Sequence, residues 1–212
     1  MLTPRWRFTD RTDGDVAVEA ERDAVLGLAG TWLRQVHGGH VVVVTRPGEH
    51  RGAEADGAVT ASPGAVLMVR TADCGPVVLT SDRVVGVAHA GWRGLAAGVV
   101  ERTLEAMVGL GAQPNAIVAR VGPLIRSRCY EFGAQDLAAL ARTLGEQVRA
   151  ETAWGAPALD TAAAITTVLH RAGVERVLDS ATCTACSPRH FSYRARGEAG
   201  RQAALVWLEG SP

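Results

Sequence analysis

The sequence contains no lysine, so all 22 of its basic side chains are arginine. This absence excludes Schiff-base catalysis, a pyridoxal-phosphate anchor and a Walker-A phosphate loop, because each needs a lysine ammonium group. Cysteine is scarce as well, with only four residues (Cys74, Cys129, Cys183 and Cys186) that are too few and too scattered for a disulfide scaffold. We expect these thiols to be buried, metal-bound or catalytic.

Long apolar runs and an excess of charge are also missing. Unbroken aliphatic stretches such as Val41–Val44 are far short of the ~20 residues that cross a bilayer. The first 13 residues contain three arginines and lack the apolar centre of a signal peptide. The 22 basic residues are balanced by 22 acidic ones, so neither nucleic acid nor an anionic membrane is expected as a partner. We therefore expect a soluble, cytoplasmic protein.

The residues that are present predict one domain of mixed α and β structure over residues 1–212. Apolar residues make up 47% of the chain, enough for one substantial core, and no linker or repeat divides it. Short β-branched runs predict strands, and amphipathic segments that end at glycines predict helices. Hairpin-length turns join several of the strands, which favours an α+β fold with mixed sheets over an alternating βαβ fold. The expected strands are 41–45, 65–70, 76–80, 84–89, 116–121, 176–178 and 203–208, and the expected helices are 16–28, 95–110, 135–150 and 160–173.

Three stretches place reactive side chains where a predicted strand meets a glycine turn: residues 35–39, 71–76 and 88–94. Strand ends are rigid, and glycines let backbone or substrate approach closely. His37, Cys74 and His89 supply two imidazoles and one thiolate, a three-ligand zinc set with the fourth position left for water or substrate. Their spacing matches no zinc finger. From these residues two interpretations remain, a zinc site or a buried thiol with two satisfied histidines at strand ends.

A family resemblance extends in order along residues 31–208. It is carried by the three stretches above together with Ala55–Thr60, Gly122-Pro123, Tyr130-Glu131, Cys183-Thr184, Phe191–Arg194 and Gly200-Arg201. These residues resemble the YfiH-type laccase-domain family. The resemblance implies a layered α/β/β/α fold, related to that of a toxin with a Cys–His deamidase site. It also implies a metal ion, zinc or else copper, on His37, Cys74 and His89.

The resemblance also implies an activity. Family members have been described as polyphenol oxidases, peptidoglycan editing factors and purine nucleoside phosphorylases with adenosine deaminase activity. We therefore expect a zinc-dependent phosphorylase that takes phosphate and a purine nucleoside (adenosine, inosine or methylthioadenosine), with adenosine deamination as a further activity. A multicopper oxidase is not expected, because six histidines without a His-x-His pair cannot supply its copper ligands.

Within this hypothesis the residues near the glycine turns take distinct roles. We expect Arg93 and Arg194 to bind phosphate, because a guanidinium fork matches phosphate oxygens. Gln35 and Tyr130 are expected to contact the substrate. Cys74 and His89 are expected to be catalytic as well as metal-binding. Asp73 is expected to carry a proton, to orient a metal ligand or to cap its own turn.

Two other functions stay open. The first is a metal-free amidase for peptidoglycan precursors, with Cys74 as nucleophile and His89 as base. The second is a binding module without turnover, because relatives carry a longer segment than Asp13–Asp15 between the first strand and the first helix. The Cys183–Cys186 pair lacks the strand-to-helix context of a redox motif and is interpreted as structural. Cys129 is interpreted as a packed thiol.

Overall fold

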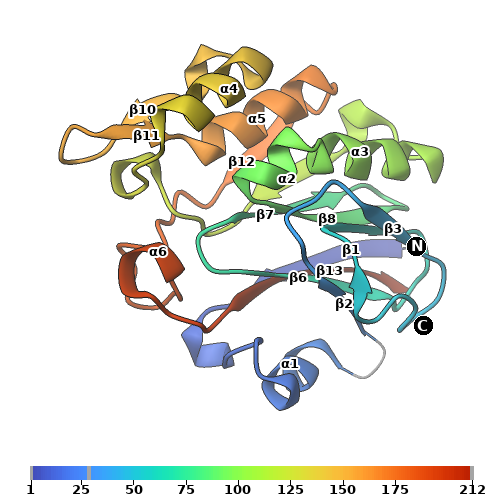
Figure 1. The fold of residues 1–212 in the computed structure, drawn as a ribbon. Helices are drawn as coiled ribbons and strands as arrows, with labels where there is room; N and C mark the ends of the chain where they lie inside the picture. Colours follow the sequence, from blue (N-terminus) through green and yellow to red (C-terminus); the bar gives the residue numbers. More distant parts are fainter. Residues whose placement is uncertain (1, 28–29, 211–212) are drawn as a thin grey trace.

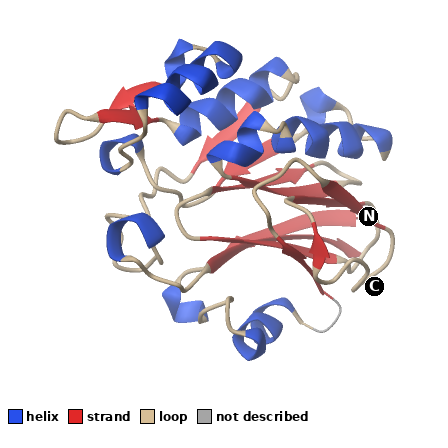
Figure 2. Cartoon of the chain, in the orientation of Figure 1, coloured by secondary structure: helices blue, strands red, loops and turns tan. Residues whose placement is uncertain are grey.

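The computed structural model describes residues 2–27 and 30–210 and arranges them in four layers. Figures 1 and 2 show a layer of helices, two stacked β-sheets, and one further helix under the second sheet. The predicted α+β class and the layered α/β/β/α arrangement are confirmed.

The sheet beneath the helical layer is mixed. Its six strands lie in the order β12 (Arg176–Asp179), β9 (Val118–Val121), β7 (Gly75–Thr80), β8 (Val85–Ala90), β5 (Gly57–Thr60) and β3 (Val41–Val44). The two outer pairs, β12 with β9 and β3 with β5, are parallel, and the inner pairs are antiparallel. Every residue of β7 and β8 is buried, because the sheet is covered on both faces. This explains why both strands read as continuous apolar runs instead of alternating patterns.

The second sheet joins the two ends of the chain. Its five strands lie in the order β1 (Leu2–Phe8), β13 (Gln202–Gly210), β6 (Val66–Thr71), β2 (Gly30–Arg34) and β4 (Ala53–Glu54). The last strand, β13, is antiparallel to both β1 and β6 and lies between them. Leu67 and Val206 of this sheet pack against Val78 and Val87 of the other, forming an apolar core between the two sheets.

The remaining elements cover the outer faces of the two sheets (Figure 1). They are α1 (Glu19–Leu26) under the five-stranded sheet; α2 (Trp92–Ala96), α3 (Val99–Gly109), α4 (Ala134–Leu144) and α5 (Thr161–Arg171) over the six-stranded sheet; the short hairpin β10 (Arg149–Glu151) and β11 (Pro157–Leu159); and the single turn α6 (Tyr193–Arg196). Leu104, Met107 and Ile165 anchor the helical layer in the largest apolar cluster. No helix within residues 2–27 and 30–210 is long and apolar enough to cross a membrane.

The predicted helix over 160–173 is confirmed, including its ends. The Asp160 carboxylate accepts the backbone N–H of Ala163 at 2.9 Å and caps α5. Gly173 follows the helix with a φ of 83°, a left-handed conformation that favours glycine.

Three helix predictions need correction. The segment 95–110 is two helices, because Gly98 interrupts it with a φ of 77°. The segment 135–150 ends its helix at Leu144, where Gly145 adopts a φ of 105°, and continues into β10. The first helix ends at Leu26, and Gly30 begins β2 instead of terminating the helix. The predicted last residue of that helix, Leu28, lies outside the described residues.

Candidate metal and substrate site

His37, Cys74 and His89 meet at one end of the six-stranded sheet. His37 lies in the loop after β2, Cys74 in the turn between β6 and β7, and His89 in β8. One ligand atom from each residue lies within 4.8 Å of the other two, and the Cys74 Sγ to His37 Nε2 distance is 3.9 Å. Tetrahedral zinc with typical bond lengths would place sulfur and nitrogen about 3.6 Å apart. The three donors therefore fit a metal ion after small side-chain adjustments.

Strand register and one glycine bring these donors together. Pro76 pairs with His89 across β7 and β8, so the turn that precedes β7 carries Cys74 to the end of β8. Gly91 follows directly after β8. A Cβ atom at Gly91 would lie 3.0 Å from Cys74 Sγ and 3.0 Å from His37 Cδ2. The absence of a side chain at this position is therefore what allows the thiol and the imidazole to approach.

Asp56, a fully buried carboxylate, organises the two histidines. Its Oδ1 accepts the His89 Nδ1–H at 2.8 Å and the His37 backbone N–H at 3.0 Å. Its Oδ2 accepts the backbone N–H groups of Val36 at 3.1 Å and Gly38 at 2.8 Å. The bond to Nδ1 leaves Nε2 of His89 as the nitrogen available to the cluster. Asp56 was not among the predicted site residues, and its sequence signal is an acidic residue directly before the strand β5.

The cluster polarises its own thiol. Burial raises the pKa of Cys74, but the charge of His89 and the hydrogen bond with His37 outweigh burial and lower this pKa to about 6. Burial lowers the pKa of His89, but the Cys74 charge and the Asp56 hydrogen bond raise it to about 9. Without a metal, Cys74 is therefore a thiolate beside an imidazolium at neutral pH. A thiolate is the form that ligates metals and attacks electrophiles.

A cavity of about 540 Å³ opens at the cluster. It is lined by all eight of the residues predicted for the site: Gln35, His37, Asp73, Cys74, His89, Arg93, Tyr130 and Arg194. Ala17 lines it too, so the short N-terminal segment reaches the same cavity. The structure thus brings the predicted residues together, while their individual roles stay predictions.

Positive charge is concentrated in this cavity. Four arginines line it, Arg70, Arg93, Arg194 and Arg201. None of them forms an ion pair with a carboxylate in the part of the chain that the structure describes. Burial and the nearby charges of Arg22 and Arg201 lower the pKa of Arg70. The cavity therefore favours an anion. Arg70 and Arg201 were not predicted, because Arg70 lies one residue before the stretch 71–76 and no local pattern shows that β13 brings Arg201 beside it.

Arg93 and Arg194, the two residues predicted to bind phosphate, differ in how many contacts their guanidinium groups already make. Arg93 is exposed and lies over the Trp92 ring at 4.4 Å. Arg194 lies over the Tyr130 ring at 4.9 Å and donates a hydrogen bond to the Glu131 carbonyl at 2.8 Å. Arg93 is therefore the more available of the two guanidinium groups for an incoming anion.

Gln35 and Tyr130 also contribute differently. The Gln35 amide donates to the Arg70 carbonyl at 2.7 Å and accepts the Arg70 backbone N–H at 2.8 Å, so it ties its loop to β6. Burial and the charge of Cys74 raise the pKa of Tyr130 to about 12. The Tyr130 hydroxyl therefore stays protonated and can donate a hydrogen bond inside the cavity.

Asp73 lines the cavity, and its carboxylate is bonded to the C-terminal segment. Its Oδ1 accepts the hydroxyls of Thr184 at 2.6 Å and Ser192 at 2.7 Å, and its Oδ2 accepts the Arg194 backbone N–H at 2.7 Å. The residue adopts a φ of 90°, an unusual conformation for a side chain with a Cβ. This geometry favours a positioning role, in which Asp73 holds the C-terminal segment at the cavity. The proton-carrier role stays a prediction.

Comparison with known proteins gives the class of this fold and site. Residues 9–209 match the family described as multi-copper polyphenol oxidoreductase laccase, and the chain belongs to this family, as predicted. Purine nucleoside phosphorylase SCO2081 of Streptomyces coelicolor is 44% identical over 93% of this chain and 85% of the relative. A purine nucleoside phosphorylase of Deinococcus radiodurans is 40% identical over 94% and 80%.

Solved structures give the same result for the fold. The crystal structure of YlmD from Geobacillus stearothermophilus has a TM-score of 0.82 and 26% identity, covering 99% of this chain and 91% of that one. The crystal structure of Neisseria meningitidis protein NMB0706 has a TM-score of 0.81 and 32% identity, with coverage of 94% and 85%. The four-layer architecture is therefore shared with these relatives along most of their length.

Proposed function

We propose that this protein is a metal-dependent purine nucleoside phosphorylase. The observation that carries the proposal is one cavity that combines a His–Cys–His donor set with four arginines lacking carboxylate partners. Phosphate needs such cations, and a departing purine needs an acid or a Lewis acid. The relatives at 40–44% identity that bear the name purine nucleoside phosphorylase support the substrate class.

Zinc is the metal that the donors fit best. Two imidazoles and one thiolate match its borderline softness, and three protein ligands leave a position for water or substrate. His37, Cys74 and His89 would hold the ion, with Asp56 fixing the His89 ring. When bound, zinc supplies a Lewis acid and lowers the pKa of a bound water. We do not extend the proposal to multicopper oxidation, because only one of the two ligand clusters found in residues 2–27 and 30–210 contains histidine.

The side chains around the donors would handle phosphate and nucleoside. Phosphorolysis forms a bond from a phosphate oxygen to the ribose C1′, breaks the bond from C1′ to the purine nitrogen, and returns a proton to the base. Arg93 is placed to orient the phosphate, and Arg70 and Arg201 add positive charge to the cavity wall. The protonated Tyr130 hydroxyl supplies a hydrogen-bond donor for the base or the ribose. The Trp92 ring offers an apolar surface for the purine.

The test uses zinc-loaded protein with inosine, adenosine or methylthioadenosine, each with and without phosphate. Release of free base and ribose 1-phosphate that requires phosphate is expected. Conversion of adenosine to inosine without phosphate would report the predicted deaminase activity at the same site. A failure to release any base from loaded, folded protein would overturn the proposal.

A Cys–His amidase is the second candidate, and one specific arrangement favours it. Cys74, His89 and Asp56 form a series of thiol, imidazole and orienting carboxylate, as in cysteine hydrolases. This activity would persist in chelator-treated protein and disappear in Cys74→Ser. Hydrolysis of peptidoglycan-precursor amides under those conditions, without phosphorolysis, would select this candidate over the first.

A further inference from the structure

Three cysteines outside the cavity converge on one another. One sulfur from each of Cys129, Cys183 and Cys186 lies within 4.8 Å of the other two, and the Cys129 Sγ to Cys186 Sγ distance is 3.3 Å. The Cys183–Cys186 pair was predicted to be structural and Cys129 to be a packed thiol. The fold brings the three residues together across more than 50 residues of chain, a contact that neither prediction included.

Backbone pairing holds the two segments in register. Leu124 and Cys183 form a parallel β-bridge, with the Leu124 N–H bonded to the Thr182 carbonyl and the Thr184 N–H bonded to the Leu124 carbonyl. The Ser187 N–H donates to the Cys183 carbonyl at 2.9 Å and closes the turn that contains Cys183 and Cys186. The convergence of the thiols is therefore built into the main chain and does not depend on side-chain rotation alone.

Backbone amides surround the Cys183 sulfur. The Arg126 N–H donates to Cys183 Sγ at 3.5 Å. Burial raises the pKa of Cys183, but hydrogen bonds from the backbone N–H groups of Arg126, Cys186 and Ala185 help to bring it below its ordinary value. Amide-to-sulfur hydrogen bonds of this kind disperse the charge of a metal-bound thiolate and fix its orientation.

We infer that Cys129, Cys183 and Cys186 form a second metal site that holds a soft divalent cation, zinc in the first instance, through three thiolates. Sulfurs on tetrahedral zinc lie about 3.8 Å apart, and the observed separations extend from 3.3 Å to within 4.8 Å. A disulfide would use only two of the three sulfurs. Cys186 is exposed, so a cation can reach the three sulfurs from solvent.

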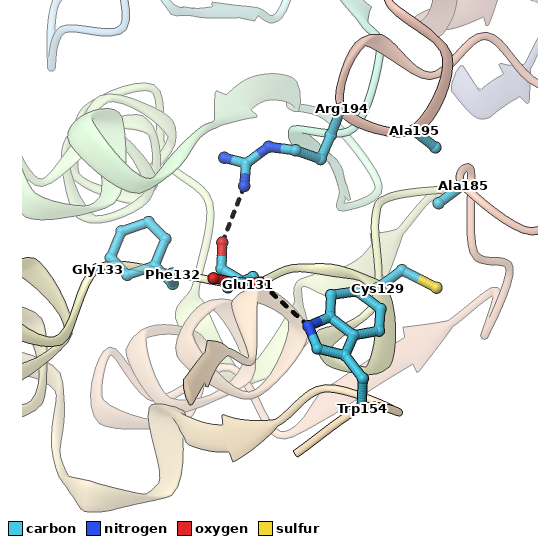
Figure 3. A pocket seen from close by; sticks show the side chains of 8 residues that line it. All are labelled: Cys129, Glu131, Phe132, Gly133, Trp154, Ala185, Arg194 and Ala195. Atoms are coloured by element: carbon cyan, nitrogen blue, oxygen red, sulfur yellow. Dashed lines mark hydrogen bonds between the residues drawn. The ribbon is translucent and has the colours of Figure 1, made fainter. Parts of the chain in front are cut away.

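The position of this site gives it a structural role. Thr184, between the two ligands of the turn, donates to Asp73, and Ala185 accepts a hydrogen bond from Arg196 of α6 at 2.9 Å. Cys129 and Ala185 also line a second cavity of about 520 Å³, and Figure 3 shows that Arg194 lines this cavity as well. A cation on the three sulfurs would thus fix the segment that delivers Arg194 to the substrate cavity.

The test measures metal content in protein purified under reducing conditions, with His37→Ala/His89→Ala as the background so that the first cluster is disabled. This background protein is expected to retain about one zinc per chain, and adding Cys186→Ser is expected to remove it. Because Cys186 is exposed, its serine variant leaves the core intact, which circular dichroism checks. Cobalt substitution of the background protein should give strong sulfur-to-cobalt charge-transfer absorption that Cys186→Ser abolishes.

Two results would overturn the inference. One is a metal content that is the same with and without Cys186→Ser, or zero in both proteins after zinc loading and desalting. The other is a protein that binds no metal when reduced but carries a Cys129–Cys186 disulfide after air oxidation, identified by peptide mass. That outcome would make the cluster a redox pair. Neither result bears on phosphorolysis, which is measured separately at the first cluster.

Discussion

Replacing Asp56 by asparagine exchanges one carboxylate oxygen for an NH₂ group at the centre of the site and keeps the shape of the side chain. Each carboxylate oxygen accepts two hydrogen bonds, one oxygen from His89 and His37 and the other from Val36 and Gly38. An asparagine has only one oxygen, and its NH₂ group would face two N–H donors. If the new NH₂ group takes the place of Oδ2, the backbone N–H groups of Val36 and Gly38 lose their acceptor. If it takes the place of Oδ1, the His37 N–H loses its acceptor, and His89 keeps a bond only by turning Nδ1 into an acceptor, which moves its proton to Nε2, the nitrogen that faces the cluster.

The expected loss of stability follows from the number of hydrogen-bond donors that lose their acceptor. A donor left unsatisfied costs about 1–3 kcal/mol, and one or two donors lose their acceptor, so Asp56→Asn is expected to lower the free energy of unfolding by about 1–6 kcal/mol. For a domain of this size the melting temperature should fall on the order of 10 °C. Loss of an orienting carboxylate typically weakens metal binding by about 10–100-fold, and kcat/KM for phosphorolysis should fall with it.

The assay combines three measurements on one preparation: thermal melting, zinc affinity by chelator competition, and phosphate-dependent base release. Asp82→Asn is the matched control, because Asp82 is exposed in the turn between β7 and β8 at the opposite end of these strands. Excess zinc should restore part of the activity of Asp56→Asn without restoring its melting temperature to the wild-type value. Wild-type melting and wild-type zinc affinity in Asp56→Asn would refute the assignment of Asp56 as the organising residue.

Further predictions concern the glycine, the phosphate ligand and the thiols. Gly91→Ala should weaken zinc binding at least 10-fold, because the new methyl group would lie 3.0 Å from Cys74 Sγ. Gly109→Ala is the control, because a Cβ atom at Gly109 would meet nothing within 4 Å. Arg93→Ala should raise the KM for phosphate by about 10–100-fold, since a charge-assisted hydrogen bond contributes about 1.5–3 kcal/mol, while the remote Arg83→Ala should not. In protein from which metal has been removed with a chelator, the Cys74 thiolate should react with iodoacetamide. The alkylation rate should therefore rise with pH, reach half of its maximum near pH 6 and be high at pH 7. Burial and the Cys186 and Cys183 thiols raise the pKa of Cys129 to about 12, so Cys129 should stay unreactive at pH 7. Equal labelling of Cys74 and Cys129 at pH 7 would contradict this prediction.

Local sequence patterns predicted much of the fold. Strands β7 and β8 are continuous apolar runs bounded by turn residues, and α5 has an acidic cap and a terminating glycine. The errors occurred at Gly98 and Gly145, where a left-handed glycine ends a helix inside a segment whose apolar spacing continues. Periodicity reports which face is buried, and the backbone conformation of one glycine is not encoded in it.

The candidate site was predicted mainly for residues within the three stretches 35–39, 71–76 and 88–94, and it was missed where only long-range strand pairing brings a residue to the cavity. Asp56 acts on His89, 33 residues away, through a buried contact that only strand register creates. Arg70 and Arg201 share a cavity because β6 and β13 are neighbours in the sheet, a pairing that no local pattern indicates. The proximity of Cys129 and Cys183 likewise depends on a β-bridge between residues far apart in sequence, Leu124 and Cys183.

The position of β13 in the sheet has a consequence for the folding of the chain during its synthesis. Synthesis on the ribosome proceeds from the N-terminus, so β13 emerges after the other strands that the structure describes, yet it fills the gap between β1 and β6. A chain truncated before Gln202 leaves the facing edges of β1 and β6 unpaired and exposes them to other chains. Arg201, which lines the cavity, lies directly before β13, so the cavity around His37 and His89 is complete only after this late segment has been made.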